Sequence, residues 1–281
     1  MANLFSGLEA FGLGNLSDMN VYEEKEKEAA GKPEDKDKPT FQEEDIIFDK
    51  TFTCPVCDRE FKTKQVKSGK VKLLSLDPDL RPVYQFMDPL KYDAIVCPLC
   101  GFSALNRFFK YVTGAQAQLI KKNISANFKG MKDTGPIFTY DDALARHKLA
   151  LVNAVVKKSK TSERAYTCLK TAWVLRGKAE SLPKDTPDYK KQIEDMDKEE
   201  LDFISKAYVG FDEAFSNESF PLCGMDESTM TLLMAELARR IGKYDEASRW
   251  ISRVLISKEA NERIKEKARD IKEKIKEQKT T

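Results

Sequence analysis

Two short stretches decide how this chain folds: TCPVCDREFKTKQVKSGKVKLL at residues 53–74 and VCPLCGF at residues 96–102. Each contains a Cys-Pro-x-Cys motif, and thirty-nine residues lie between the two cysteine pairs. Two such pairs supply the four thiolates of a tetrahedral zinc site. The sequence therefore predicts one zinc ion, held by Cys54, Cys57, Cys97 and Cys100.

The residues that follow each pair suit the turn that such a site needs. Asp58 and Gly101 come directly after the second cysteine of each pair, and both residue types tolerate a left-handed backbone. Four protein ligands leave no open position for water, so we expect a structural ion rather than a catalytic one. The alternative is a thiol redox centre, whose first cysteine usually begins a helix near a βαβ pattern. Neither pair has that setting.

The other two cysteines lie outside this pattern. Cys168 stands among apolar residues of a predicted helix, where a small buried side chain is its ordinary role. Cys223, in PLCGM, has no second cysteine nearby. We assign neither to the metal.

Short apolar runs around the cysteine pairs predict a small zinc-ribbon-like β domain over residues 46–103. The alternation in EFKTKQV (60–66) is typical of a half-exposed strand, and Ser68-Gly69 is expected to turn the chain into a second strand in KVKLLSL (70–76). The next segment, residues 77–92, contains three prolines and is predicted to be a loop. Because this region has few apolar residues, we expect its stability to depend on the metal.

Residues 104–279 carry a helical pattern, so the fold class is mainly α with a small β module. Apolar residues recur there three and four positions apart. Thr139 with Asp142 resembles a capping box that begins a helix. The last predicted helix has a narrow stripe of Ile264, Ala268 and Ile271, continued by Ile275, and would cover the end of a helical array. The predicted helices cover residues 103–112, 114–122, 139–158, 162–176, 186–215, two antiparallel helices in 229–257, and 258–279.

The N-terminal part reads differently. Residues 1–22 have apolar side chains at roughly helical spacing, interrupted by glycines, and are expected either to pack on their own domain or to dock on a partner or a second copy of the protein. Residues 23–45 are dense in charge and predict a flexible linker. No apolar run could span a bilayer, and the start lacks a secretion signal, so we expect a cytoplasmic protein without membrane contact.

Several of these stretches resemble a known bacterial family. The first cysteine pair with its SGK turn, DPDLRPVYQFMDPLKYDAIVCPLCGFSA at residues 77–104, and the helical remainder are similar to the family known as domain of unknown function 2225. The resemblance runs from about Ile46 to the last helices. It implies a bacterial cytosolic protein with a zinc-ribbon-like front and a helical back. Because the family has no assigned function, the resemblance supplies no catalytic residue.

The helical part also resembles tetratricopeptide repeats, most clearly in LLMAELARRIGKYDEASRWISRVL at residues 232–255. Gly242, Tyr244 and Ala247 match the repeat's turn glycine, the aromatic residue beneath the turn and the small residue of the second helix. Residues 144–177 match more weakly, without the Gly-x-Tyr turn. Such helical pairs stack into a concave surface that receives peptides, and the alternative is a compact helical domain with no groove.

The function that we predict is a zinc-binding, non-enzymatic interaction or scaffold protein, with an unknown protein or peptide as partner on the helical array. The alternative is an RNA- or DNA-binding factor that uses a basic hairpin. Lysine and arginine (48) nearly balance aspartate and glutamate (46), so any such binding requires a local patch. The candidate patch consists of Arg59, Lys62, Lys64, Lys67, Lys70 and Lys72.

Enzymatic activity has little support in the sequence. His147 is the single histidine, and no Ser-His-Asp or Cys-His relay is apparent around it. No glycine-rich phosphate loop is present. A carboxylate-based enzyme would have to use residues near the cysteine pairs, namely Asp77, Asp79, Arg81, Tyr92 and Asp93.

Overall fold

The computed structural model describes residues 42–133 and 135–280, which fall within one compact unit. The predicted apolar head at residues 1–22 and nearly all of the predicted linker lie outside the described residues. In the described part of the chain, eight α-helices accompany six short strands. The predicted fold class, mainly helical with a small β module, is therefore confirmed.

The strands form three separate two-stranded antiparallel sheets. β1 (Ile47–Thr53) pairs with β2 (Glu60–Val66), β3 (Leu73–Leu76) with β4 (Pro82–Tyr84), and β5 (Ala94–Val96) with β6 (Ser103–Leu105). The first cysteine pair lies in the turn between β1 and β2, and the second pair lies in the turn between β5 and β6. Each Cys-Pro-x-Cys motif is therefore the tip of a hairpin.

Three local predictions for this region are wrong. No hairpin forms across Ser68-Gly69, because β2 pairs with β1 and β3 pairs with β4. Pairing with β1 sets the buried rings of Phe52 and Phe61 opposite each other, which a β2–β3 hairpin would not do. The predicted loop at 77–92 contains β4 and a short 3-10 helix, η3 (Pro89–Tyr92). The predicted helix at 103–112 begins instead as the fully buried strand β6, an ambiguity that short apolar runs carry.

The helices follow the predicted order with modest shifts at their ends. They are α1 (Glu43–Ile46), α2 (Gly114–Ile120), α3 (Tyr140–Val156), α4 (Thr161–Ser181), α5 (Tyr189–Asn217), α6 (Glu227–Arg240), α7 (Tyr244–Ile256) and α8 (Glu262–Thr280), with a π-helical turn η4 (Lys121–Ser125) after α2. Thr139 and Asp142 form the predicted capping box of α3. Helix α1 covers the last three residues of the predicted linker, so this end of the linker is helical.

The helix predicted at 162–176 does not end before Gly177. The helix continues to Ser181. A Cβ atom at Gly177 would lie 2.8 Å from the ring of Tyr140 on α3, so this glycine permits the close approach of the two helices. Close packing rather than chain reversal is therefore the reason for this glycine.

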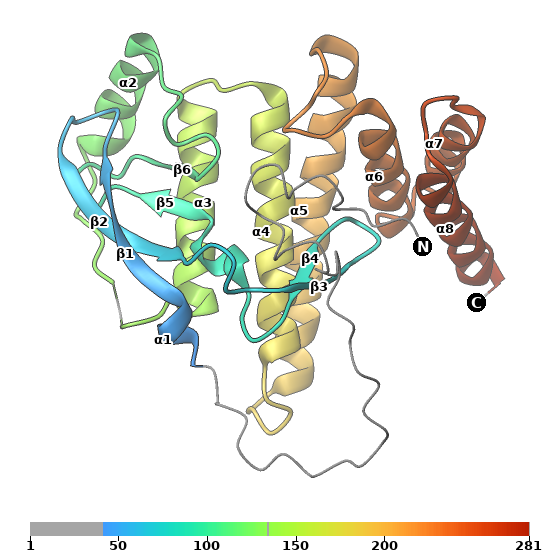
Figure 1. The fold of residues 1–281 in the computed structure, drawn as a ribbon, viewed down its shortest axis with the longest axis horizontal. Coiled ribbons are helices and arrows are strands. Elements are labelled where there is room, and N and C mark those ends of the chain that lie inside the picture. Colours follow the sequence, from blue (N-terminus) through green and yellow to red (C-terminus); the bar gives the residue numbers. More distant parts are fainter. Residues whose placement is uncertain (1–41, 134, 281) are drawn as a thin grey trace, which may run out of the picture. The chain divides into compact units, whose positions relative to one another are not determined.

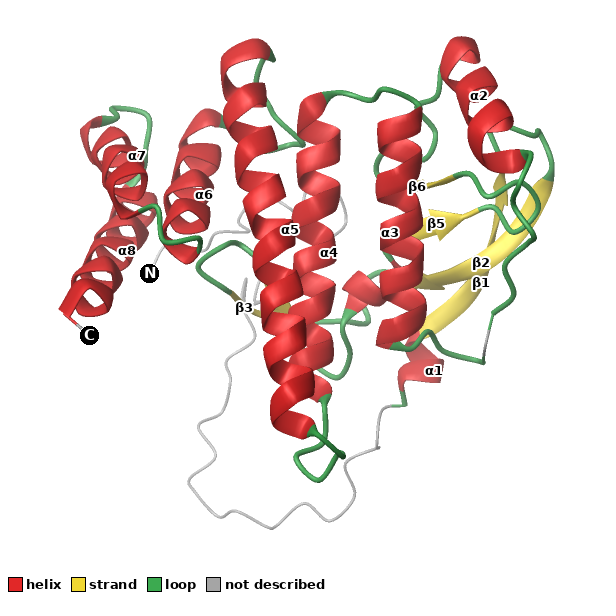
Figure 2. Ribbon diagram, turned by 180° about the vertical axis from the view of Figure 1, so that it is seen from behind, coloured by secondary structure: helices red, strands yellow, loops and turns green. Residues whose placement is uncertain are grey.

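Helices α3 to α8 lie side by side in chain order, as Figure 1 and the reverse view in Figure 2 both show. β5 and β6 pack on α3, and β1 and β2 lie on the same side of that helix, away from α4 (Figure 1). The main apolar core is formed by residues of all the helices from α3 to α8, and a second core includes three of the four cysteines. The predicted end helix α8 buries Ala268, Ile271 and Ile275, as its stripe indicated.

Candidate functional site

Each cysteine pair lies in a tight turn closed by backbone hydrogen bonds. The Asp58 N–H donates to the Cys54 carbonyl at 2.9 Å, and the Gly101 N–H donates to the Cys97 carbonyl at 3.0 Å. Asp58 has φ 59° and Gly101 has φ 74°, the left-handed conformation predicted for both. The two turns therefore have the same backbone design, and each directs both of its cysteines to one side.

The four cysteine sulfurs form one cluster. All four Sγ atoms lie within 4.8 Å of one another. The Sγ atoms of Cys54 and Cys100 are 3.6 Å apart, and those of Cys57 and Cys97 are 3.8 Å apart. A tetrahedral ion with metal–sulfur bonds of about 2.3 Å requires sulfurs about 3.8 Å apart. The cluster is therefore suited to a metal ion that prefers thiolates.

Hydrogen bonds among the thiols make their acidities unequal. Hydrogen bonds from Cys100 and Cys54 lower the pKa of Cys97, whereas hydrogen bonding to Cys100 raises the pKa of Cys54. The negative charge thus collects on part of the cluster, and a divalent cation would displace the remaining protons. All six cysteines of the chain are free of disulfides, and neither Cys54 nor Cys97 begins a helix; each follows a strand.

An aromatic core packs against the cysteine cluster. The ring of Phe109 lies 5.7 Å from that of Phe52, 6.0 Å from that of Phe61 and 5.0 Å from that of Phe102. These rings come from β1, β2, the residue after the second cysteine turn and the chain after β6. The core joins the two hairpins and so holds the two cysteine pairs face to face.

Helix α3 anchors the second cysteine turn. The side-chain amide of Asn153, which is fully buried, donates to the Gly101 carbonyl at 3.0 Å. The hydroxyl of Ser103 donates to the Arg146 carbonyl on the same helix. The side chain of Phe128 closes over Gly101, where a Cβ atom would lie 2.6 Å from its Cγ. The cysteine cluster is thereby tied to the helical part of the chain.

Cations lie close to the cysteine turns. Hydrogen bonding to Cys57 raises the pKa of Arg59, whose guanidinium also donates to the Leu99 carbonyl. A cavity of about 260 Å³ beside Pro98 is lined by Lys62, Lys132 and Arg146. Four thiolates with one dication carry a net charge of −2, which nearby cations offset.

The predicted nucleic-acid patch is only partly available in the structure. Arg59 faces the cysteines, Lys64 lies 3.7 Å from Asp49 across β1 and β2, and Lys67 donates to the Asp45 carbonyl. The side chains of Lys62, Lys70 and Lys72 are exposed. Because β2 and the segment after Gly69 do not form one hairpin, the six patch residues do not lie on the single ribbon hairpin that was predicted.

Cys168 and Cys223 lie apart from the cluster, as predicted. Burial raises the pKa of Cys168 to about 11 and that of Cys223 to about 12. The Cys223 thiol donates to the Ser162 carbonyl. Both therefore stay protonated and inert near neutral pH.

His147 is fully buried in α3. Its Nδ1 lies 2.8 Å from the Ala143 carbonyl, so this nitrogen carries the proton, and its Nε2 has no partner among the described residues. Burial lowers its pKa; Asp93 acts against this shift, whereas Lys170 and Arg146 reinforce it. Its full burial agrees with a structural role.

Two of the candidate carboxylates, Asp77 and Asp79, belong to an ion-pair network, whereas Asp93 pairs with Lys170 at 3.2 Å. Asp79, 1% exposed, accepts hydrogen bonds from Arg176 on α4, from Arg240 on α6 and from the Trp173 indole. Glu200 on α5 pairs with the same two arginines at 2.7 and 2.8 Å. Asp77 and Arg81 extend the network to Glu180. The 77–81 loop is therefore fastened to α4 and α6, and through their arginines to α5, and its carboxylates are occupied by this role.

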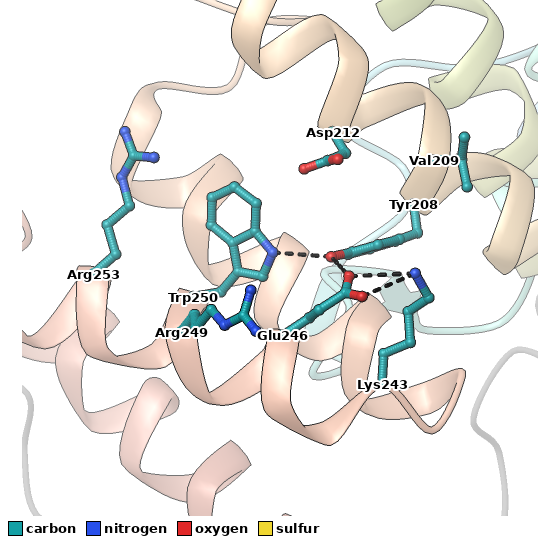
Figure 3. A pocket seen from close by; sticks show the side chains of 8 residues that line it. All are labelled: Tyr208, Val209, Asp212, Lys243, Glu246, Arg249, Trp250 and Arg253. Carbon is teal, nitrogen blue, oxygen red and sulfur yellow. Dashed lines mark hydrogen bonds and ion pairs between the residues drawn. The ribbon is translucent and has the colours of Figure 1, made fainter.

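A groove between α5 and α7 has a volume of about 520 Å³. Figure 3 shows the Trp250 ring beside the Tyr208 hydroxyl in the middle of this groove. The Trp250 Nε1–H donates to the Tyr208 hydroxyl at 3.2 Å, and that hydroxyl donates to Glu246. Its lining residues are Tyr208, Val209, Asp212, Lys243, Glu246, Arg249, Trp250 and Arg253.

The sequence did not single out this groove. Tyr208 falls within the predicted helix at 186–215 as one of its recurring apolar positions, and Trp250 falls within the repeat-like stretch at 232–255. The available signal was the repeat resemblance at residues 232–255, since Gly242 has φ 76° between α6 and α7 and Ala247 is fully buried, as the repeat requires. The groove itself needs α5 beside α7, and no spacing along the chain specifies that contact.

Among the described residues, every helix is too short or too polar to cross a membrane.

The comparisons with known proteins give one match. No curated protein and no solved structure matches the chain. One family model matches residues 47–275, which covers both cysteine pairs and nearly all of the helical array, and it is described as an uncharacterised protein conserved in bacteria, DUF2225. The earlier resemblance is thereby confirmed: the chain belongs to the DUF2225 family.

Proposed function

We propose that this protein is a zinc-stabilised, non-enzymatic interaction protein whose α5–α7 groove binds a segment of a partner protein. The observation that carries the proposal is the pair of Trp250 and Tyr208, which lies in an open groove of about 520 Å³. Cavities of this size suit a bound side chain or short segment. Tryptophan and tyrosine are the residue types that most often dominate binding energy.

The groove is organised before any partner binds. The Tyr208 hydroxyl is held between the Trp250 indole and Glu246, and Lys243 holds Glu246 at 3.1 Å. These contacts fix the aromatic pair, so little conformational entropy would be lost on binding. Val209, which is 57% exposed, adds an apolar contact on the α5 wall.

The zinc ion would have a structural role in this proposal. Cys54, Cys57, Cys97 and Cys100 would hold it, and a closed tetrathiolate supplies a cross-link rather than a site for water or substrate. It would join the two hairpins, which otherwise depend on one small aromatic core. The contribution to folding would be on the order of 10 kcal/mol or more.

Two measurements test the proposal. Metal analysis of the purified protein should find one zinc per chain, and a Cys54→Ser/Cys97→Ser variant should lose it together with the near-ultraviolet signal of the front module. Peptides selected from a random displayed library should bind the wild type about 30-fold more tightly than Trp250→Ala, the loss expected at a hot spot. Leu201→Ala, an exposed α5 residue outside the groove, is the matched control. Selected peptides that ignore Trp250→Ala would contradict the groove's role.

A nucleic-acid-binding role is the second candidate, supported by the exposed side chains of Lys62, Lys70 and Lys72. A variant with Lys62, Lys64, Lys67 and Lys70 changed to serine should then lose salt-sensitive affinity for single-stranded RNA or duplex DNA. A wild-type protein with no affinity for either nucleic acid would exclude this role and would not bear on the peptide-binding proposal.

A further inference from the structure

The walls of the α5–α7 groove differ in charge. The α7 wall carries Lys243, Arg249 and Arg253, whereas the α5 wall carries Asp212 next to Val209. With Glu246 included, three cations and two carboxylates line the groove, so its formal charge is +1. Figure 3 shows Arg253 and Lys243 at opposite ends of the groove, with Trp250 between them.

Two of the three cations already have partners. Lys243 pairs with Glu246 at 3.1 Å. Arg253 pairs with Glu227 at 2.6 Å and stacks on the Phe215 ring at 4.4 Å. These contacts hold the two side chains in the folded protein and leave less of their charge to a ligand.

Arg249 is different. Its side chain is exposed and makes neither a hydrogen bond nor an ion pair with another described residue. Arg249 and Trp250 line the same groove (Figure 3), so a group that pairs with the guanidinium would also lie near the indole. Arginine binds carboxylates in a planar, two-point geometry that lysine does not offer.

Asp212 makes the α5 wall of the groove negative, opposite the cations of the α7 wall. It is exposed on α5 and likewise has no hydrogen-bonding or ion-pair partner for its side chain among the described residues. A carboxylate in the groove would be repelled from the α5 wall and attracted to the α7 wall. Arg249 would repel a ligand cation at the α7 wall. It would therefore discriminate against basic segments as well as attract acidic ones.

Building on the proposed function, we propose that the bound segment is an acidic peptide of a partner protein. It places an apolar side chain against Trp250 and Val209, and a nearby aspartate or glutamate carboxylate pairs with Arg249. The apolar contact supplies most of the affinity, and the carboxylate decides which segments bind.

The test uses three matched sets of synthetic peptides and the full-length protein. Each set has one central leucine, phenylalanine or tryptophan, flanked by glutamate in the first set, by lysine in the second and by serine in the third. Binding is followed by the anisotropy of a labelled peptide and, for the tryptophan-free peptides, by the emission of Trp250. Trp173, the other tryptophan, is 3% exposed and contributes a constant background.

The glutamate set should bind roughly tenfold more tightly than the serine set, and the lysine set should bind most weakly. Arg249→Glu should reverse the order, so that the lysine set binds best. Arg263→Glu makes the same change of charge on exposed α8 and should leave the order unchanged. A reversal of preference cannot come from unfolding, which would weaken all three sets equally.

The remaining outcomes separate the two proposals. Equal binding of all three sets, lost in Trp250→Ala, would overturn the acidic preference and leave the groove as a peptide site. Binding of no set at millimolar concentration would overturn both. Self-association of the purified protein that Arg249→Glu abolishes would assign the groove to a second copy of the chain and overturn the separate partner.

Discussion

Replacing Asp79 by alanine should destabilise the protein more than any exposed charge change. Asp79 is 1% exposed and accepts hydrogen bonds from Arg176 at 2.5 Å, from Arg240 at 3.1 Å and from the Trp173 indole at 3.1 Å. Its removal leaves two arginines with 16% and 20% exposed side chains short of one partner. Breaking a buried ion pair from one side costs about 3–5 kcal/mol.

The lower end of this range applies, because the network has a second carboxylate. Glu200 remains 2.7 Å from Arg176 and 2.8 Å from Arg240, so neither arginine is left without a negative neighbour. We therefore expect Asp79→Ala to lower the free energy of unfolding by about 3 kcal/mol. Asp79→Asn, which still accepts from Trp173, should cost less.

Urea denaturation, followed by circular dichroism at fixed zinc concentration and analysed by linear extrapolation, measures this change. Asp141→Ala is the matched control, since it removes an ion pair with Lys178 in which the carboxylate is 76% exposed. Such a pair contributes below about 1 kcal/mol. Equal losses in the two variants would refute the view that the 77–81 loop is held by a buried network.

Two further predictions concern the metal turn and the buried histidine. Gly101→Ala and Gly69→Ala both place a side chain at positive φ, 74° and 76°, but only the first meets Phe128. Calorimetry should therefore show that Gly101→Ala lowers stability by about 1–3 kcal/mol more than Gly69→Ala does. Gly101→Ala should also retain zinc more weakly in a chelator titration. Equal losses would show that the left-handed backbone alone decides. Because burial lowers the pKa of His147, the unfolded state binds more protons below about pH 6.5, and stability should fall with decreasing pH by up to about 1.4 kcal/mol per pH unit. Urea titrations between pH 7.5 and 5 should show this slope reduced in His147→Gln; an unchanged slope would exclude His147 as its source.

Local chemistry made much of the molecule predictable from the sequence. The spacing within each cysteine pair and the residues after them specify the two turns, since a turn involves only neighbouring residues. Helical periodicity located α3, α5 and α8 within a few residues, because each buries one stripe along its own length. Thr139 and Asp142 marked the start of α3 for the same reason.

Pairing and packing between distant segments were decided only by the tertiary structure. β2 has a strand-like pattern that suits either neighbour, and burial of Phe52 against Phe61 selects β1. Gly177 reads as a helix end until Tyr140 is seen against it. The alternation within a strand does not encode its partner, and a glycine does not reveal whether a turn or a close contact requires it.

The ion-pair network and the proposed binding groove also depend on long-range packing. Asp79 meets Arg240 across 161 positions of the chain, and Tyr208 meets Trp250 across 42. The sequence by itself determined a four-cysteine centre and a helical array, because their signals repeat over a few residues. The ion-pair network and the α5–α7 groove required the folded chain, because burial and charge compensation arise only where separate helices come into contact.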